Sequence, residues 1–542
     1  MSELVERRRG WDALLTGAWW LHPFLFAAVP IVFLFAHNVR EQLSLDPLLE
    51  PLGLALGAAA VLLAALSGLA ILLRREPARA ALVATLAIVL FMTYGHAWNA
   101  AGPLLGIHRN LLLVWGALGL VGAVLAARAP ISAVRAVTGG LNVIGLILLV
   151  INAIPIADHQ LRVASVVGGA PAAEADPSVQ GESPAHDRDV WYLVFDRYAS
   201  ASVLEEVYGL DNSDFIAELR ALGFYVADRS TANYLKTAHS LASALSADYL
   251  DQEALRAEAA APDDWTPLYR RLQGAYPLQE FLDARGYTYL HLGVRRGATV
   301  TNSAADREFV YSGQTEFSTT LRETTLLEGL DHVFRPGGSF VPGGVTGLYG
   351  LQTLYQLRTL EELAETAGGR RYVFAHLLVP HPPYLFHADG SWVTPEEAEG
   401  RTDEQGYAEQ VRFVNNRLRA LLDILLDRPR EEWPIIILMA DEGPFPRRYA
   451  EDEEGFDWRR ATPDELFQKF GILTAVLLPD AGPKEAGLYP EITPVNVIRA
   501  VLRAEFGAEL PPLPDRNWIF TDQRHLYDFV DATERVPRQP PG

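Results

Sequence analysis

Long apolar stretches separated by short polar segments dominate the first third of the chain. A helix needs about 20 mostly apolar residues to cross the hydrocarbon core of a bilayer. Five stretches satisfy this requirement: residues 18–37, 52–73, 80–98, 111–127 and 137–156. The first stretch is not a signal peptide, because no small-residue cleavage site follows it and four more spans come after it. The pattern therefore predicts a transmembrane domain of five helices within residues 1–156.

The arginines between these stretches predict an orientation. The segments before the first stretch, between the second and third, and between the fourth and fifth contain eight arginines, whereas the alternate segments contain two. Cytoplasmic loops of membrane proteins carry an excess of basic residues. We therefore expect a multi-pass protein of the cell membrane with a cytoplasmic N-terminus, and five spans then put the rest of the chain outside the cytoplasm.

A second pattern follows, in which short apolar runs alternate with amphipathic stretches. The runs are Trp191–Phe195, Tyr287–Leu292, Tyr372–Val379, Ile435–Ala440 and Ile472–Leu478, and the amphipathic stretches include Asp214–Leu222, Leu278–Arg285 and Tyr407–Leu426. Short apolar runs are typical of buried parallel strands, and their alternation with helices indicates an α/β fold. We expect a mostly parallel sheet covered by helices on both faces in residues 189–530.

Two segments lack such patterns. Residues 157–188 are expected to form a flexible linker, because Gly168–His186 is rich in alanine, proline, glycine, serine and acidic residues without periodicity. The proline-rich end, residues 531–542, is expected to be a disordered tail. The region 302–356 has few strong signals, and we assign it no role.

Composition excludes several classes of function. The chain of 542 residues has no cysteine, so disulfides, thiolate catalysis and cysteine metal sites are absent. Residues 1–156 carry a net charge of +3 and the remainder −24, which together give the −21 of the chain. An acidic soluble part argues against a nucleic-acid partner, since phosphate binding needs a basic surface. Only three residues are lysine (Lys236, Lys469 and Lys484) against 43 arginines, which we attribute to genomic base composition.

Acidic residues and a histidine follow three of the predicted strands. Asp196 directly follows the first run, His381 comes two residues after the third, and Asp441 and Glu442 directly follow the fourth. A single aspartate at a strand end is more often a helix cap than a ligand. Because the carboxyl ends of parallel strands meet at one edge, where ligands bind, the joint occurrence indicates a site for a hard cation.

A hydroxyl that could act as a nucleophile lies in the segment Tyr234-Leu-Lys-Thr-Ala-His-Ser-Leu-Ala-Ser. Leu241, Leu245 and Tyr249 repeat at helical spacing, so a helix is expected to begin near Thr237. Backbone N–H groups and the dipole at a helix N-terminus favour anions, which suits a phosphoryl group under attack. The alternative is that Thr237 only caps the helix, because threonine is also a common helix cap.

These elements resemble the alkaline phosphatase/sulfatase superfamily. The likeness is greatest to its membrane branch of lipoteichoic acid synthases (phosphoglycerol transferases) and lipid A phosphoethanolamine transferases, in which five spans precede an extracytoplasmic domain. It covers most of the chain. The matching motifs are Val194-Phe-Asp-Arg, Lys236-Thr-Ala-His-Ser240, His376-Leu-Leu-Val-Pro-His381-Pro-Pro and Asp441-Glu-Gly443.

The resemblance implies a role for each motif. One divalent ion (Mn²⁺, Mg²⁺ or Zn²⁺) would be held by Asp196, Asp441 and Glu442 and would touch Thr237, the nucleophile. His381 would contact the transferred group or protonate the leaving group, with His376 as support. The substrate-binding candidates are Lys236, Ser240 and, more weakly, His239.

Two departures from the family pattern limit these implications. The family's Asp-His-Gly is Asp441-Glu-Gly443 here, and a glutamate adds negative charge and favours harder ions. Either the metal site is retuned, or metal binding and catalysis are impaired. Many sulfatases have a second aspartate directly after the first one. This chain has Arg197 at that position, so a site for a single ion is expected. A formylglycine sulfatase is not expected, because its motif and its cysteine are missing.

The expected function is therefore a metal-dependent extracytoplasmic phosphotransferase. It would move a phospho-head-group from a phospholipid donor to an envelope glycan or lipid acceptor through a phospho-threonine intermediate. Two alternatives stay open: a sulfatase-like phosphodiesterase or hydrolase that uses the same residues with water, and a catalytically impaired envelope-assembly protein.

Overall fold

The computed structural model describes residues 17–167, 187–295, 297–311, 316–334, 344–366 and 368–540. These residues fall into two compact units. The first unit contains residues 17–167 together with 316–334, and the second contains 187–311 together with 344–540. Most of the predicted linker, residues 168–186, lies outside the described residues.

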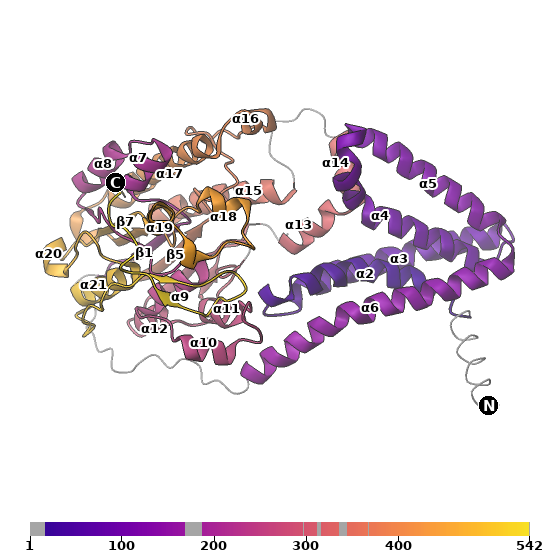
Figure 1. Cartoon of the computed structure of the whole chain (residues 1–542), viewed down its shortest axis with the longest axis horizontal. Coiled ribbons are helices and arrows are strands. Elements are labelled where there is room, and N and C mark those ends of the chain that lie inside the picture. The colour runs from indigo at the N-terminus through magenta and orange to yellow at the C-terminus, as the bar shows by residue number, and fades with distance from the viewer. Residues whose placement is uncertain are drawn as a thin grey trace. The chain divides into compact units, whose positions relative to one another are not determined.

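The first unit is built from five apolar helices, one for each predicted stretch (Figure 1). They are α2 (Leu21–His37), α3 (Asp46–Leu72), α4 (Pro77–Leu105), α5 (His108–Arg128) and α6 (Ile131–Val167), and a 3₁₀ turn, η1 (Val39–Glu41), follows α2. Four of them, α3 to α6, are long and apolar enough to cross a membrane, while α2 has 17 residues. The predicted apolar helices are confirmed, whereas their orientation and the number of crossings stay predictions. The end of α6 at Val167 shows that the first residues of the expected linker continue the helix.

Large apolar side chains on these helices face outward. Leu72 is 82% exposed, and Val61, Leu120 and Ile154 are exposed as well. Soluble proteins rarely present such wide apolar surfaces to water. Lipid is therefore the environment that suits this unit.

Two short helices from the middle of the chain also belong to the first unit. They are α13 (Glu316–Glu323) and α14 (Leu326–Phe334). The ring of Phe317 lies 5.9 Å from that of Phe35 in α2, and Gly95 N–H of α4 donates to the Thr324 carbonyl at 2.9 Å. A Cβ at position 95 would come within 2.0 Å of the Glu323 carbonyl oxygen, so this close approach requires glycine. Part of the region without an assigned role thus packs on the apolar helices.

The second unit contains a seven-stranded sheet in the order β2-β7-β6-β1-β5-β3-β4. Its strands are β1 (Val190–Phe195), β2 (Tyr225–Val226), β3 (Thr288–Leu292), β4 (Arg307–Glu308), β5 (Arg371–Leu377), β6 (Ile435–Met439) and β7 (Thr474–Leu477). All five predicted apolar runs form strands, and β6, β1, β5, β3 and β4 are parallel to their neighbours in this series. The two-residue strands β2 and β4 are too short to leave a pattern in the sequence.

The last long strand, β7, runs antiparallel to β6, whereas the sequence pattern predicted a parallel strand. The reason is that the chain stays at the carboxyl end of β6 before it turns back. Gly443 N–H donates to the Lys469 carbonyl at 2.9 Å, and Ala440 N–H donates to the Leu473 carbonyl at 3.0 Å. The strand therefore begins at the same edge at which β6 ends, and Lys469 is brought to that edge.

Helices cover both faces of this sheet (Figure 1). One layer comprises α7 (Ala201–Tyr208), α8 (Ser213–Ala221), α15 (Gly344–Glu365), α16 (Pro395–Glu399), α17 (Asp403–Leu426) and α19 (Pro463–Phe470). The other comprises α9 (Thr237–Ser246), α10 (Gln252–Glu258), α11 (Thr266–Gln273), α12 (Pro277–Asp283) and α21 (Pro494–Phe506). Smaller elements are η2 (Arg430–Glu432), α18 (Arg447–Glu451), η3 (Trp458–Arg460), α20 (Pro483–Ala486) and the β8–β9 pair (Trp518–Ile519 with Val530–Asp531). The predicted fold class, apolar helices followed by an α/β unit with a mostly parallel sheet, is confirmed.

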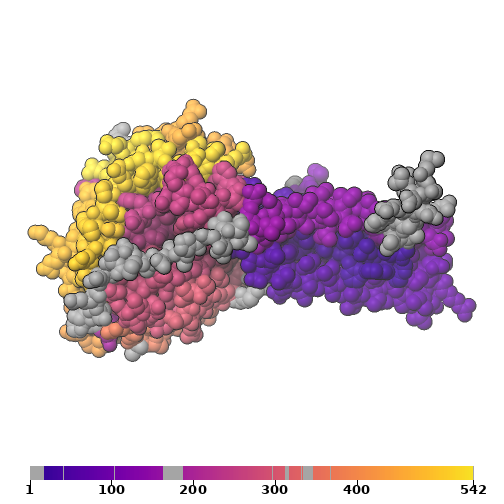
Figure 2. Space-filling view, turned by 90° about the horizontal axis from the view of Figure 1, so that it is seen from below, coloured from indigo at the N-terminus to yellow at the C-terminus, as the bar shows by residue number. Residues whose placement is uncertain are grey.

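The C-terminal residues are packed rather than disordered up to residue 540, where the described chain ends. Ala532 N–H donates to the Asn517 carbonyl at 2.8 Å, and the Arg538 guanidinium binds Thr231 and, at 3.0 Å, the Asn517 side chain. Figure 2 shows the yellow C-terminal part of the chain lying against earlier residues of the same unit. Residues 531–540 thus make specific hydrogen bonds to the rest of the second unit, which their proline-rich composition did not predict.

Candidate functional site

Three neighbouring strands deliver ligand groups to one edge of the sheet. Asp196 follows β1 directly, Asp441 follows β6 after one residue, and His376 is the penultimate residue of β5, paired in register with Val194. All three side chains are buried, at 3%, 2% and 1% exposure. One ligand atom of each lies within 4.8 Å of the others. The strand order β6-β1-β5 thus brings together residues that are 245 positions apart in the sequence.

The chemistry of these atoms fits a divalent cation. Asp196 Oδ1, Asp441 Oδ2 and His376 Nε2 are buried and make no hydrogen bond to any described residue. Burial raises the pKa of Asp441, and the nearby charges of Asp196 and Glu442 raise it further. Burial alone would lower the pKa of His376, but the surrounding carboxylates raise it overall. Both shifts reflect a buried excess of negative charge, which a bound cation would neutralise.

The candidate nucleophile lies beside this group. Thr237 is the first residue of α9, half-buried, and the preceding Lys236 has extended backbone angles. A hydrogen bond from the Thr237 side chain lowers the pKa of Asp441 against the raising effects. The structure therefore brings Thr237 together with the three ligand groups, at the N-terminal end of a ten-residue helix.

The turn that carries Asp196 is strained. Arg197 has φ of +61°, in the left-handed region that non-glycine residues rarely adopt. Its carbonyl accepts a hydrogen bond of 2.7 Å from the Tyr407 hydroxyl, which itself accepts one of 3.0 Å from Ala199 N–H. Strained backbone of this kind clusters at functional sites, where the surroundings hold it.

Glu442, expected as a metal ligand, is not in the group of three ligands. Its Oε1 lies 3.0 Å from Arg197 Nε and 3.1 Å from Lys469 Nζ. Glu442 and Lys469 are both fully buried, and Lys469 also donates to the Gly443 carbonyl at 2.8 Å. Glu442 thus pairs with two basic side chains, of which Lys469 has its pKa lowered to about 7 by burial. The imidazole near the carboxylates comes from His376 instead.

Three cations surround the ring of Phe445. Arg197 Cζ, Lys236 Nζ and Lys469 Nζ lie 4.1, 4.2 and 3.5 Å from its centroid. Lys236 also donates to the Tyr449 hydroxyl at 2.7 Å. We call Arg197, Lys236 and Lys469 the cationic cluster. Of these three residues, only Lys236 was a candidate for the site from the sequence. Lysine is rare in this chain, and two of its three lysines lie here, so this rarity was a usable signal.

His381 is close enough to Asp196 for their charges to interact, and its Nδ1 contacts the Pro382 carbonyl. A carbonyl only accepts, so Nδ1 carries the hydrogen and Nε2 has the lone pair. Burial lowers the pKa of His381 to about 3, and the charge of Arg197 contributes. The ring is therefore neutral at physiological pH, and its Nε2 lone pair can accept a hydrogen bond.

The remaining two candidates point away from the cluster. His239 is buried among aromatic rings that include Trp265, Phe520 and Phe529, and its Nε2 donates to the Leu526 carbonyl at 3.0 Å. The Ser240 hydroxyl donates to the Tyr234 carbonyl at 3.1 Å. Both side chains anchor α9 in the core, and the structure does not bring them to the ligand groups.

The buried His239 is expected to make the protein sensitive to acid. Burial lowers its pKa to about 3, whereas in the unfolded chain it is 6.5. The unfolded state therefore binds the proton first, so stability is complete above pH 6.5 and falls by about 1.4 kcal/mol per unit as the pH drops below that value. Thermal unfolding of the full-length protein in detergent between pH 7.5 and 5 should show that His239→Gln loses less stability than wild type. Parallel losses in both proteins would contradict this assignment.

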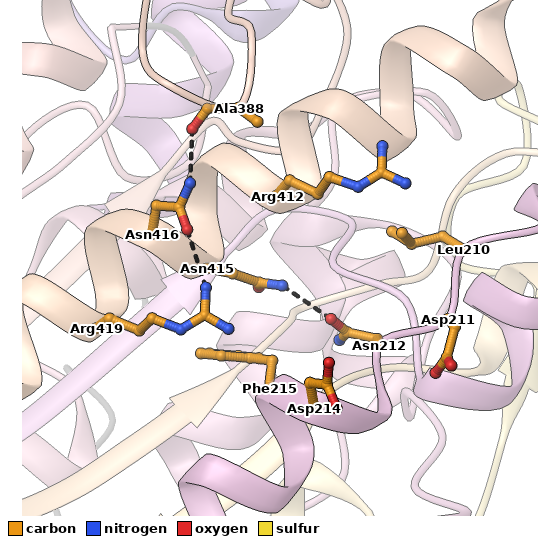
Figure 3. Close-up of a pocket in the computed structure, with 10 residues that line it drawn as sticks. All are labelled: Leu210, Asp211, Asn212, Asp214, Phe215, Ala388, Arg412, Asn415, Asn416 and Arg419. Atoms are coloured by element: carbon orange, nitrogen blue, oxygen red, sulfur yellow. Dashed lines mark hydrogen bonds between the residues drawn. The ribbon is translucent and has the colours of Figure 1, made fainter.

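A separate cavity of about 250 Å³ opens between α17 and the turn that precedes α8 (Figure 3). Asp211, Asp214, Arg412 and Arg419 line it, and none of the candidate site residues does. At its wall, the Asn415 side chain donates to Asn212 at 2.8 Å; both amides bond to the hydroxyl of a buried tyrosine, residue 198. That tyrosine follows Arg197 in the chain, so this amide pair helps to fix the turn that carries Asp196.

Comparisons with known proteins give low similarity. No family model matches the sequence, and no curated protein does. Among solved structures, the chain is similar to the C-terminal periplasmic domain of EcEptC from Escherichia coli in complex with Zn, at 12% identity and a TM-score of 0.42 over 67% of this chain and 97% of that domain. It is also similar to a protein in the alkaline phosphatase superfamily from Vibrio parahaemolyticus, at 13% identity and a TM-score of 0.40 over 67% and 81% of the two chains. The integral membrane protein lipooligosaccharide phosphoethanolamine transferase A from Neisseria meningitidis matches over 96% of both chains at 12% identity and a TM-score of 0.34. Because these identities and scores are low, the function of this chain has to be inferred from its own residues.

Proposed function

We propose that this protein is a metal-dependent phosphotransferase that moves a phospho-head-group from a phospholipid to an envelope glycan or lipid acceptor. The observation that carries the proposal is the group of Asp196, His376 and Asp441, three buried residues that each offer a ligand atom within 4.8 Å of the others. Thr237 lies beside them at the start of α9. A hydroxyl next to a cation site is the arrangement that nucleophilic phosphoryl transfer requires.

A divalent ion held by Asp196, His376 and Asp441 would supply positive charge that lowers the pKa of a neighbouring hydroxyl and offsets charge on phosphoryl oxygens. Carboxylate and imidazole ligands suit Zn²⁺ and Mn²⁺. The cationic cluster supplies further positive charge from the chain itself. Arg197 and Lys469 are fixed by Glu442, and such preorganised donors stabilise the transition state without having to reorient.

The covalent step is assigned to Thr237. Its Oγ1 would bond to phosphorus while the bond from phosphorus to the lipid oxygen breaks and the Thr237 hydroxyl proton passes to that oxygen, which leaves a phospho-threonine that carries the head group and a released diacylglycerol. His381, with a free lone pair on Nε2, would orient the acceptor hydroxyl in the second step by accepting its hydrogen bond. The new ester bond then forms as the bond to Thr237 breaks, and the proton of the acceptor hydroxyl returns to Thr237 Oγ1.

The apolar helices support a place for this reaction at the membrane. Eight arginines lie in the segments expected on one side and two in the alternate segments, which favours a cytoplasmic N-terminus. With five crossings, the α/β unit would lie outside the cytoplasm, where outer-leaflet lipid could serve as donor. The alternative function, a phosphodiesterase that uses the same residues with water, differs only in the acceptor.

The test is a transfer assay with the full-length protein in vesicles that contain head-group-labelled phospholipid. With Zn²⁺ or Mn²⁺ and a hydroxylated glycolipid present, label is expected on the glycolipid, and removal of the ion with a chelator should abolish transfer until the ion is restored. Label that appears only as free head group, with and without the glycolipid, would favour the hydrolase. Release or transfer that is indifferent to the chelator would contradict both enzyme proposals.

A further inference from the structure

The ring of His376 has a second partner on the side away from the carboxylates. Its Nε2 lies 3.7 Å from Asp196 Oδ2, too far for a hydrogen bond, while its Nδ1 lies 2.8 Å from Thr299 Oγ1. Both His376 and Thr299 are 1% exposed, so water does not compete for this contact. The orientation of the His376 imidazole thus depends on Thr299, which lies in the loop after β3.

The loop that carries Thr299 is held in place by close packing. It follows β3 and folds back so tightly that a Cβ on Gly293 would come within 1.6 Å of the Thr299 carbonyl oxygen. Only glycine permits this approach. From α15, the Gln356 side chain donates to the carbonyls of Gly293 at 3.1 Å and His376 at 2.7 Å. One side chain therefore ties the loop to the strand that carries His376.

A chain of buried polar groups continues behind Thr299, and its hydrogen positions can be deduced. The Thr299 carbonyl only accepts, so His291 Nε2, at 3.0 Å, carries the hydrogen. Burial lowers the pKa of His291 to about 4, so the ring is neutral and its Nδ1 accepts from the Tyr289 hydroxyl at 2.9 Å. Tyr289 in turn accepts from the Tyr276 hydroxyl at 2.8 Å. Each link has a single consistent direction, and this series of hydrogen bonds connects the Thr299 backbone to β3.

We propose that Thr299 is a positioning residue for the metal site, because its hydroxyl oxygen accepts the Nδ1 hydrogen of His376 and leaves the Nε2 lone pair facing Asp196 and Asp441. The inference rests on the proposed function, which requires a cation at these atoms. A histidine that binds a cation through one nitrogen needs an acceptor for the hydrogen on the other, and such partners fix the tautomer and strengthen binding. Thr299 is the acceptor that the structure places at Nδ1. The residue lies in the loop after β3, and no sequence motif singles it out.

The test compares Thr299→Val with Thr299→Ser in the full-length protein in detergent, titrated with Zn²⁺ against a chromogenic chelator. Valine keeps the shape but removes the acceptor, and the Zn²⁺ affinity is expected to fall about 10- to 100-fold. Serine keeps the hydroxyl and should bind Zn²⁺ within about threefold of wild type. The matched control is Thr353→Val, since the buried Thr353 hydroxyl donates within α15 to the Tyr349 carbonyl at 3.0 Å, and its affinity should not change.

A Zn²⁺ affinity of Thr299→Val equal to that of wild type would overturn the inference, and so would a wild-type protein that binds no Zn²⁺. If Thr299→Val shows no cooperative thermal transition, Thr299→Ala replaces it, because the smaller side chain cannot overpack the loop, and the same loss of affinity is expected. A different result would contradict the proposed function alone. In that case wild type and Thr299→Ser would bind Zn²⁺ tightly and Thr299→Val weakly, as the inference expects, but none of the three proteins would transfer a head group.

Discussion

Replacement of Thr237 by alanine is expected to reduce head-group transfer by roughly a thousandfold or more, because nucleophile deletions in covalent catalysis cost factors of this order. The measurement is transfer from labelled phospholipid by the full-length protein in vesicles. An acid quench during turnover should trap label on the wild-type protein and none on Thr237→Ala. Zn²⁺ binding by the variant should remain measurable, since Asp196, His376 and Asp441 are all retained.

Two further variants make the Thr237 experiment specific. Thr237→Ser keeps an oxygen nucleophile at the start of α9 and should retain both transfer and trapped label. Ser240→Ala removes a hydroxyl that donates to the Tyr234 carbonyl at 3.1 Å, and its turnover should stay close to that of wild type. Unchanged turnover in Thr237→Ala would exclude Thr237 as the nucleophile and leave the ligand group without its proposed use.

Replacement of Glu442 by histidine, which restores the family's Asp-His-Gly, is expected to damage the protein when made alone. Arg197 Nε at 3.0 Å and Lys469 Nζ at 3.1 Å would lose their shared carboxylate in a buried setting. Removal of one partner of a buried ion pair typically costs about 3–5 kcal/mol. Thermal unfolding of the full-length protein in detergent should therefore show a clear loss for Glu442→His.

The double variant Glu442→His with Lys469→Met should recover much of that loss, since the buried ammonium is removed together with its counter-charge. Glu451→Gln is the control, because the pair of Glu451 with Arg447 is exposed and should contribute less than about 1 kcal/mol. If Glu442→His were as stable as wild type, the assignment of Glu442 as the anchor of two cations would be wrong. This result would reopen its assignment as a metal ligand.

The residues at the ends of the strands could be predicted from the sequence, but the side chains that surround them could not. Asp196 and Asp441 could be located because each follows an apolar run directly, and parallel strands must end at a common edge. Lys469 could not be located, because it reaches the site through the reversal of β7 against β6, and direction is not encoded in an apolar run. Arg197 was visible as a departure from a family motif, but its contact with Glu442 depends on a left-handed turn.

Other differences have the same origin in long-range packing. The C-terminal residues have the composition of a disordered tail, yet Arg538 is held by Thr231 and Asn517, which are distant in the sequence. The expected linker began too early because α6 continues to Val167 beyond the apolar stretch. The composition of a segment determines which structure it would adopt by itself. In the folded protein, contacts with residues that are distant in the sequence decide its structure.

The two helices α13 and α14 have a practical consequence for anyone who expresses the α/β unit by itself. A protein that begins at residue 187 would still contain Glu316–Phe334 but not the apolar helices on which it packs, so Phe317 and Leu321 would lose their partners in the membrane unit. Such freed apolar side chains favour aggregation. A version in which a short glycine-serine segment replaces residues 314–340 should elute as a monodisperse species, whereas the uncut version should self-associate. The apolar helices thus bury the apolar side chains of α13 and α14, two helices whose sequence lies between segments of the α/β unit.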